Sequence, residues 1–280
     1  MDYVNPSDVV ESMVEAGAKK AKLPVHQLLV RGFLGAALLG FATTLAFTFE
    51  LQTKIGMLGA IIFPVGFVMI ILLGLELVTG SFALIPLAVM EKKATVSEML
   101  RNFFWVIIGH IIGGIIYGLM IYVSITNFGQ TFENPLTQKI IAVADVKTNG
   151  YATMGADGLL IVFIKAMLCN WMVTLGAVLA MVSKSTAGKI IAMWLPITTF
   201  FGQGFEHAVV NMFVIPTGIL LGADVTIIDW WLWNQIPVTI GNLVSGFLFT
   251  GLALYFIHKI SAKKKEQPQE VHERLKKVSF

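Results

Sequence analysis

Residues 204–213 read GFEHAVVNMF, which places a carboxylate and an imidazole, Glu206 and His207, side by side in a long apolar tract. The nearest charged residues outside this pair are Lys189, 18 residues before His207, and Asp224, 17 residues after it. At helical spacing these distances place His207 near the centre of a bilayer. An ionisable residue at that depth is a functional candidate by default.

The composition indicates a membrane protein. Of the 280 residues, 56% are hydrophobic and 13% are charged, and the mean hydropathy is +0.78. A soluble domain averages about 25% charged residues. The net charge of +3 is small and the chain carries no nucleotide-binding or nucleic-acid-binding motif, so no nucleic acid partner is expected. We interpret the chain as one polytopic bundle in a lipid bilayer.

Six apolar tracts are separated by charged or polar segments. A 20-residue basic and acidic stretch follows the last tract, and a helical pattern of apolar residues precedes the first. The longest polar connection, residues 127–157, is expected to be a loop. The tracts are 28–49, 54–91, 103–126, 158–182, 189–224 and 236–258. The predicted parts are an amphipathic helix at the membrane surface (1–25, capped by Ser7 or Asp8), a transmembrane domain (26–260) and a charged tail (261–280).

The basic residues predict the orientation of the chain. With six spans, 16 of the 20 lysines and arginines fall on one side of the membrane. They lie before the first tract, after the second and fourth tracts, and after the sixth. By the positive-inside rule, both termini are expected to be cytoplasmic in a multi-pass protein of the plasma membrane.

The second and fifth tracts are too long for one straight span. They hold 36 and 34 residues between their charged ends, which is about 50 Å of helix against a hydrocarbon core of about 30 Å. Polar residues, glycine and proline gather in GLELVTGSFALIP (74–86) and in FFGQGFEHAVVNMFVIPTG (200–218). We therefore expect an all-α fold of six spans in two inverted halves of three, with spans two and five broken. Paired interruptions of this kind indicate a substrate path at the midplane.

Helix geometry predicts different roles for the residues of GFEHAVVNMF. Adjacent residues point about 100° apart on a helix, so Glu206 and His207 are not expected to face the pore together. Glu206 is expected to cap the second half-helix, and Glu76 to do the same at the first break. Asn211, one turn after His207, is expected either to orient the imidazole or to bond the facing loop. The pattern assigns no role to His110.

Four motifs identify a family resemblance. FPVGFVMIILLGLELVTG (63–80), MLCNW (167–171), GFEHAVVNMFVIPTG (204–218) and IPVTIGN (236–242) together resemble the formate/nitrite transporter family of anion channels. The chain is mildly closer to the formate branch. The resemblance implies an aquaporin-like fold, a homopentamer with one pore in each protomer, and no cofactor or metal.

The resemblance also implies site residues. The central pore histidine falls on His207 and the threonine of the broken helix on Thr79, while Asn211 lies along the same path. The vestibule lysine falls on Lys147, with Lys165 as the alternative because about seven extra residues follow Lys147. Two positions depart from the family pattern at Phe67 and Val78, and His110 stands where asparagine is usual. The apolar constrictions implied are Phe63 and Phe200 on one side, with Phe67, Leu77 and Val78 on the other.

The expected function is transport of small monovalent anions, formate first and nitrite second, with His207 able to protonate the substrate. Hydrosulfide and short monocarboxylates such as lactate are alternatives within the same family. An aquaporin-like channel for neutral solutes is less favoured because the NPA tripeptides are absent from the sequence. A membrane metalloenzyme is disfavoured because the sequence holds no HExxH motif and no cluster of His and Cys ligands, so no enzymatic activity is expected.

Overall fold

The computed structural model describes residues 2–260, so the predicted charged tail at 261–280 lies outside the described residues. Helices make up the secondary structure of these residues, apart from one isolated bridge between Tyr3 and Ser183. Four helices in this range are long and apolar enough to cross a bilayer. They are α2 (Val25–Thr53), α6 (Val96–Thr126), α9 (Ala156–Val182) and a continuous helix over Ile227–Lys259.

The last long helix is irregular along its length. It begins as α12 (Ile227–Trp230), and α-helical and π-helical turns then alternate from η1 to η3. Its N-terminus is fixed by Thr226, whose hydroxyl accepts a hydrogen bond from the Asp229 amide while the Asp229 carboxylate accepts one from the Thr226 amide. Such a reciprocal capping box satisfies two amides that the first helical turn leaves free. The successive segments are η1 (Trp231–Gln235), α13 (Ile236–Ser245), η2 (Gly246–Leu252), α14 (Ala253–Tyr255) and η3 (Phe256–Ile260).

The two long apolar tracts are each interrupted. One is divided into α3 (Gly56–Ile62), α4 (Pro64–Leu72) and α5 (Val78–Met90), and the other into α10 (Thr186–Gly202) and α11 (Ala208–Leu220). Residues 73–77 and 203–207 are non-helical. Each of these two segments contains a glycine, Gly74 or Gly204, with φ +65°. L-residues avoid this left-handed conformation, so a glycine is needed where the chain turns out of α4 and α10.

Close backbone contact joins α2 to α6. A Cβ atom on Gly113 would lie 2.2 Å from the carbonyl oxygen of Phe33, and one on Gly109 would lie 2.6 Å from that of Leu29. No side chain fits at these distances, so the small residues of this helix allow the two backbones to approach.

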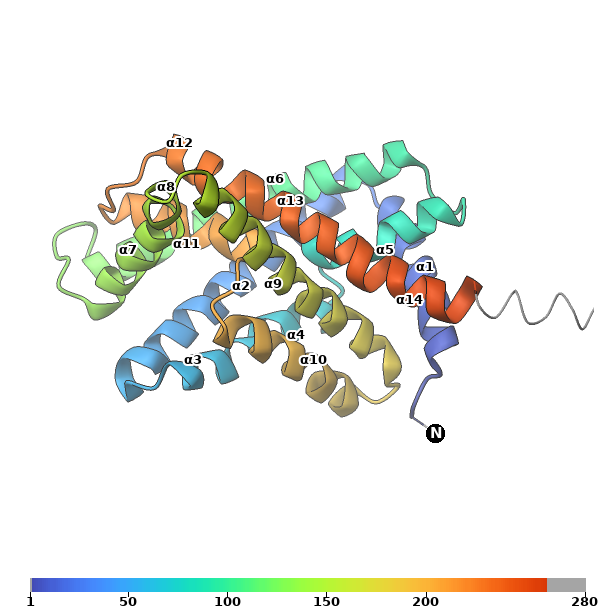
Figure 1. Cartoon of the computed structure of the whole chain (residues 1–280). Helices are drawn as coiled ribbons and strands as arrows, with labels where there is room; N and C mark the ends of the chain where they lie inside the picture. Colours follow the sequence, from blue (N-terminus) through green and yellow to red (C-terminus); the bar gives the residue numbers. More distant parts are fainter. Residues whose placement is uncertain (1, 261–280) are drawn as a thin grey trace, which may run out of the picture.

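The N-terminal helix α1 (Pro6–Ala21) packs on protein. It lies at the same end of the molecule as the end of the last helix, whereas α7, α8 and α12 lie at the opposite end (Figure 1). Its buried face contacts residues of α5, α9 and α14: Val9, Val10, Met13 and Val14 pack with Leu84, Leu87, Val178 and Tyr255. The helix is amphipathic, and its apolar side is buried against protein. The helix begins at Pro6 and its N-cap residue is Asn5, so the predicted cap at Ser7 or Asp8 is wrong.

The polar connection 127–157 is not a simple loop. It contains α7 (Pro135–Lys147) and the short α8 (Asn149–Ala152). Asn134 accepts a hydrogen bond from the Leu136 amide, and Pro135 occupies the first turn, where its missing N–H is not needed. Ile140 and Ala144 are fully buried, and Ala144 lies directly against Gly218 of α11. The prediction of a loop was wrong because the apolar residues of α7 are few and stand among polar residues in the sequence.

Ion pairs hold α1 to its neighbours and predict a pH dependence of its docking. Glu11 pairs with Lys259 at 2.7 Å and with Lys93 at 2.9 Å, and Glu15 pairs with Lys93. Hydrogen bonds from Lys259 and then Lys93 lower the pKa of Glu11 from 4.5 to about 2. Because the folded-state pKa is depressed, the stabilising effect is present above pH 4.5 and is lost as the pH falls toward 2.

We therefore expect the contact of α1 with the Lys93 and Lys259 side chains to loosen as the pH falls from about 4.5 to about 2, while its buried apolar face stays in place. A spin-label distance between α1 and the loop at Lys92 measures the change, with Glu11→Gln as the control. That variant should show a longer or broader distance already at pH 7 and a weaker response to acid. An acid response equal to that of the wild type would contradict this account.

Candidate functional site

The two interrupted segments meet at one side-chain contact. Thr79, in the first turn of α5, places its hydroxyl oxygen Oγ1 3.0 Å from the Nε2 atom of His207 at the start of α11. Both side chains are buried. The threonine and histidine that the resemblance assigned to the site, 128 residues apart in sequence, are thus direct neighbours.

The hydrogen bonds of His207 define its tautomer. Its Nδ1 atom accepts a hydrogen bond from the Val210 amide at 3.2 Å, so this nitrogen carries a lone pair and the imidazole is neutral. The ring proton therefore sits on Nε2 and is donated to Thr79 Oγ1. His207 is also the N-cap of α11, with extended backbone angles. Thr79, as the acceptor of this bond, keeps its own hydroxyl proton available to a third group.

Buried polar side chains satisfy the first amide of each second half-helix. The Val78 amide donates to Nε2 of His110 at 3.1 Å, and the Ala208 amide donates to Oδ1 of Asn242 at 2.9 Å. His110 in turn donates from Nδ1 to the carbonyl of Gly32 at 2.7 Å. His110 and Asn242 therefore serve the same purpose at the two breaks, although one is an imidazole and the other an amide.

Asn242 and Asn170 extend this support into the neighbouring helices. The Asn242 amide group donates to the carbonyls of Ala166 and Glu206, at 2.7 and 3.1 Å. Asn170, from the MLCNW motif, donates to the carbonyl of Thr79 at 3.1 Å and to that of Asn242 at 2.6 Å. The backbone on both sides of the Thr79–His207 contact is thereby anchored to α9 and α13.

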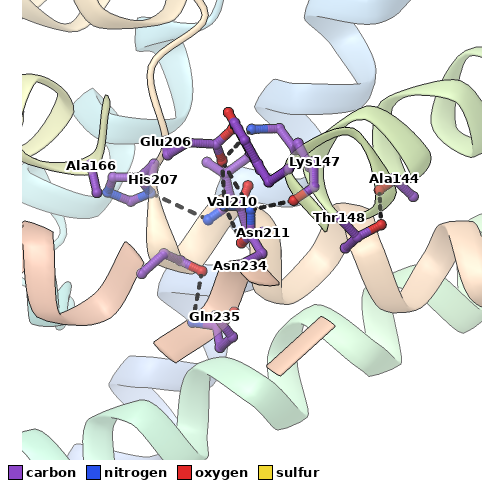
Figure 2. Close-up of polar contacts among 12 residues, drawn as sticks. Ala144, Lys147, Thr148, Ala166, Glu206, His207, Val210, Asn211, Asn234 and Gln235 are labelled. Atoms are coloured by element: carbon purple, nitrogen blue, oxygen red, sulfur yellow. Dashed lines mark hydrogen bonds and ion pairs between the residues drawn. The ribbon is translucent and has the colours of Figure 1, made fainter. Parts of the chain in front are cut away.

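Glu206 is the centre of a buried side-chain network (Figure 2). Its Oε2 atom accepts from Lys147 Nζ at 2.7 Å, from Asn211 at 2.8 Å and from Asn234 at 3.3 Å, while its Oε1 atom accepts from the Tyr151 hydroxyl at 2.8 Å. The side chain is 2% exposed. All four of these partners are side chains, and none of them is a backbone amide of α11.

A second carboxylate occupies the corresponding place at the first break. Glu76, also 2% exposed, pairs with Lys20 of α1 at 2.9 Å and accepts from the Ser81 hydroxyl at 3.4 Å. Each break thus has one buried carboxylate that is neutralised by a lysine from a helix outside the apolar tracts.

Two expectations about these residues change. The capping of α11 is carried out by His207 and Asn242, while Glu206 bonds α7, α8 and the start of the last helix. The helix-face argument for Glu206 does not apply, because residues 203–207 are not helical. The Asn211 side chain donates to Glu206 and Asn234 rather than to the imidazole.

Two cavities of about 400 Å³ approach the breaks from opposite ends. The α7 cavity reaches His207 and is bordered by Lys139, Lys147, Lys165 and Glu206. The α1 cavity borders Glu76 and is lined by Lys20, Arg31 and Lys189. Lysine and arginine side chains therefore surround both approaches.

The residues assigned to apolar constrictions are buried beside the breaks. Phe63, Phe67, Leu77, Val78 and Phe200 are each at most 3% exposed. The Phe200 ring stacks on the His207 imidazole with 5.7 Å between ring centroids, and Phe63 meets Phe200 edge to face at 5.6 Å. Aromatic rings therefore border the imidazole directly, which limits the room for water beside it.

Sequence reasoning missed the residues that hold the site in place. Tyr151 and Asn234 bind Glu206, and Asn170 and Asn242 anchor the breaks. A signal existed for the asparagines, since an amide in an apolar membrane tract needs a partner. Tyr151 gave no such signal because it lies in a polar connection.

A helical membrane protein with two interrupted helices that meet at buried polar groups, between two cavities rich in cations, is a membrane transport protein by architecture. The sequence model of the formate/nitrite transporter family matches residues 7–256. The chain belongs to the formate/nitrite transporter family.

Individual relatives agree with this assignment. The chain is 37% identical to the uncharacterized transporter YrhG of Bacillus subtilis (96% of this chain, 99% of that one). It is 32% identical to a probable formate transporter of Methanothermobacter thermautotrophicus (91% and 97%). A solved FNT family ion channel superposes with a TM-score of 0.76 at 25% identity (89% and 98%). A pentameric formate channel with formate bound superposes at 0.68 and 22% identity (84% and 97%).

The buried Lys147–Glu206 pair predicts a strong effect of removing one partner. Lys147→Met leaves the Glu206 carboxylate uncompensated in the interior, which typically destabilises a protein by about 3–5 kcal/mol. We expect a clearly lower temperature of unfolding in detergent, and partial recovery when Glu206→Gln is added. The matched control is Lys139→Met, whose partner Glu50 is 35% exposed and whose loss should cost about 0–1 kcal/mol. Equal effects of Lys147→Met and Lys139→Met would contradict the prediction.

Proposed function

We propose that the chain transports small monovalent anions across the plasma membrane, formate first and nitrite second, through a pore in each protomer. The observation that carries the proposal is the Thr79–His207 contact, where two interrupted helices bring a hydroxyl and an imidazole N–H together at membrane depth. Both groups are hydrogen-bond donors of the kind that a small oxyanion needs.

The proposed architecture has six spans in two inverted halves. Four long helices and the two interrupted tracts supply the spans. Equivalent features support the inverted repeat: Gly74 and Gly204 share their φ angle, Glu76 and Glu206 each pair with a lysine, and His110 and Asn242 bond equivalent amides. The basic segments favour a cytoplasmic position for α1 and both termini. We propose a homopentamer because the similar solved formate channel is pentameric.

The proposed path runs from one cavity to the other past His207. Cations at both mouths raise the local concentration of anions. Phe63 and Phe200 on one side of the Thr79–His207 contact, and Phe67, Leu77 and Val78 on the other, then form apolar constrictions that disfavour a hydrated charge. Lys147 borders the α7 cavity, and Lys147 and Asn211 both bind Glu206 beside the proposed path.

A proton on the substrate lowers the barrier in such a path, because a neutral acid avoids the cost of an unpaired charge in apolar surroundings. Neutral His207 offers only a hydrogen bond from Nε2. To act as an acid it must first take up a proton at Nδ1, which breaks the bond from the Val210 amide. Transfer of the Nε2 proton to a formate oxygen then yields formic acid and a neutral imidazole.

Hydrosulfide and lactate are the alternative substrates, since each is a monovalent anion of a weak acid and meets the same donors. Aquaporin-like conduction of neutral solutes is less supported, because neutral solutes gain nothing from cations around both cavities.

Substitutions at the contact test the proposal in proteoliposomes. Thr79→Ala should lower formate flux roughly 10- to 100-fold, because a hydrogen bond to a charged group contributes about 1.5–3 kcal/mol. Thr79→Ser keeps the hydroxyl and is the matched control, with flux near that of the wild type. His207→Asn should lower flux and abolish its pH dependence.

Two results would overturn this account. Unchanged flux in Thr79→Ala would remove Thr79 from the path. Identical pH profiles for His207→Asn and the wild type would exclude a protonation role for His207.

A further inference from the structure

His110 is a buried histidine that has no part in the proposed path. It lies on α6, is fully buried and joins two backbones. Its Nδ1 atom donates to the Gly32 carbonyl of α2 at 2.7 Å, and its Nε2 atom accepts from the Val78 amide of α5 at 3.1 Å. The accepting Nε2 carries a lone pair, so the ring is neutral with its proton on Nδ1. Both ring nitrogens are therefore used by backbone groups.

The start of α5 depends on this ring because α5 has no cap of its own. The N-cap residue of α11, His207, accepts a hydrogen bond from the Val210 amide. The N-cap residue of α5 is Leu77, whose apolar side chain makes no such bond. His110 supplies from α6 the acceptor that Leu77 lacks. Without the imidazole, the Val78 amide would be left unpaired among buried apolar side chains.

The bond to His110 lies one residue from the proposed substrate contact. Thr79 follows Val78 in the first turn of α5, and its hydroxyl oxygen lies 3.0 Å from Nε2 of His207. On the other side, Asn170 of α9 donates to the Thr79 carbonyl at 3.1 Å. Hydrogen bonds from α6 and α9 thus fix the backbone before and after Thr79, which sets where its hydroxyl lies.

We propose that His110 is a positioning residue for Thr79, whose hydroxyl it holds at His207 through the backbone of α5. His110 does not touch the anion, because both of its nitrogens are bonded to the backbone. An amide side chain can take its place, since Asn242 meets the same need at the second break with one acceptor and two donors. The effect on transport rests on the proposed function, whereas the effect on the Thr79–His207 contact does not.

Nitrogen-15 and proton NMR of histidine-labelled protein in lipid tests the contact without transport. The Nε2–H resonance of His207 reports on the hydrogen bond to Thr79. His110→Leu should move this resonance, because the backbone that carries Thr79 loses one of its two anchors. His110→Asn should leave it at the wild-type position. An unmoved resonance in His110→Leu would overturn the proposal.

The matched control removes a different buried hydrogen bond between the same two helices, α2 and α6. The Tyr117 hydroxyl of α6 lies 2.7 Å from Oγ1 of Thr44 on α2, and Tyr117→Phe removes this bond while keeping the ring. The control should leave the His207 resonance unchanged. Equal shifts in Tyr117→Phe and His110→Leu would show a general loosening of the bundle and would also overturn the proposal.

Formate flux in proteoliposomes measures the consequence for transport. His110→Leu should lower flux about 2- to 10-fold, the effect of one hydrogen bond, while His110→Asn should stay within about twofold of the wild type. Added to Thr79→Ala, His110→Leu should lower flux no further, because its effect acts through a hydroxyl that is already missing. A full additional loss in this double variant would contradict a positioning role.

Two further outcomes separate the possible failures. If His110→Leu yields no folded protein, His110→Asn decides: a folded His110→Asn with a shifted His207 resonance or strongly reduced flux would overturn the proposal. If the wild type carries no formate, the proposed function fails, and the resonance of His207 still shows whether His110 positions Thr79.

Discussion

The structure depends on satisfying backbone N–H groups where two helices are interrupted inside an apolar bundle. An unpaired amide in such surroundings costs several kcal/mol, and no bulk water is present to compensate for it. The Val78 and Ala208 amides are bonded by His110 and Asn242, which come from neighbouring helices, and the Val210 amide is bonded by His207 itself. His207, the proposed pore histidine, therefore also makes one of the hydrogen bonds that stabilise the break. Protonation at Nδ1 would act on both properties together.

The charged side chains near the two breaks are of two kinds, those paired in buried ion pairs and those not paired with a carboxylate. Each break places one carboxylate in the interior, and a buried carboxylate is tolerated only when paired and hydrogen-bonded. Lys20 and Lys147 meet this need, from α1 and α7, two helices that lie at opposite ends of the molecule (Figure 1). Arg31 and Lys165, which border the two cavities, form no ion pair with a carboxylate among residues 2–260.

Much of the fold could be predicted from the pattern of apolar residues. The excess length of two tracts located both interruptions, because 36 residues do not fit a hydrocarbon core of about 30 Å as one helix. The pairing of Thr79 with His207 came from the family resemblance, since contacts across 128 residues have no local signal. Helical spacing failed for Glu206 because the segment around it is irregular. It also failed to reveal α7, whose apolar stripe is short.

Other features could not be predicted because they depend on three-dimensional proximity. Nothing in the sequence around His110 indicates that its ring accepts a hydrogen bond from the first amide of a half-helix, as Asn242 does at the other break. Nothing around Tyr151 indicates a hydrogen bond to Glu206. The pairing of Lys147 with Glu206 also depends on the folded structure, since Lys147 and Lys165 both border the same cavity. Only the position of the two carboxylates shows which lysine is already neutralised.

The central claim is that neutral His207 carries its proton on Nε2, which donates to Thr79 in the structure and turns to the anion when one binds at the junction of the two breaks. Nitrogen-15 NMR of histidine-labelled protein in lipid tests it directly, because the two buried histidines have opposite tautomers: His207 is protonated on Nε2 and His110 on Nδ1. The account predicts that formate shifts the Nε2 resonance of His207 and leaves His110 unchanged. A His207 that is protonated on Nδ1, or that does not respond to formate, would contradict it.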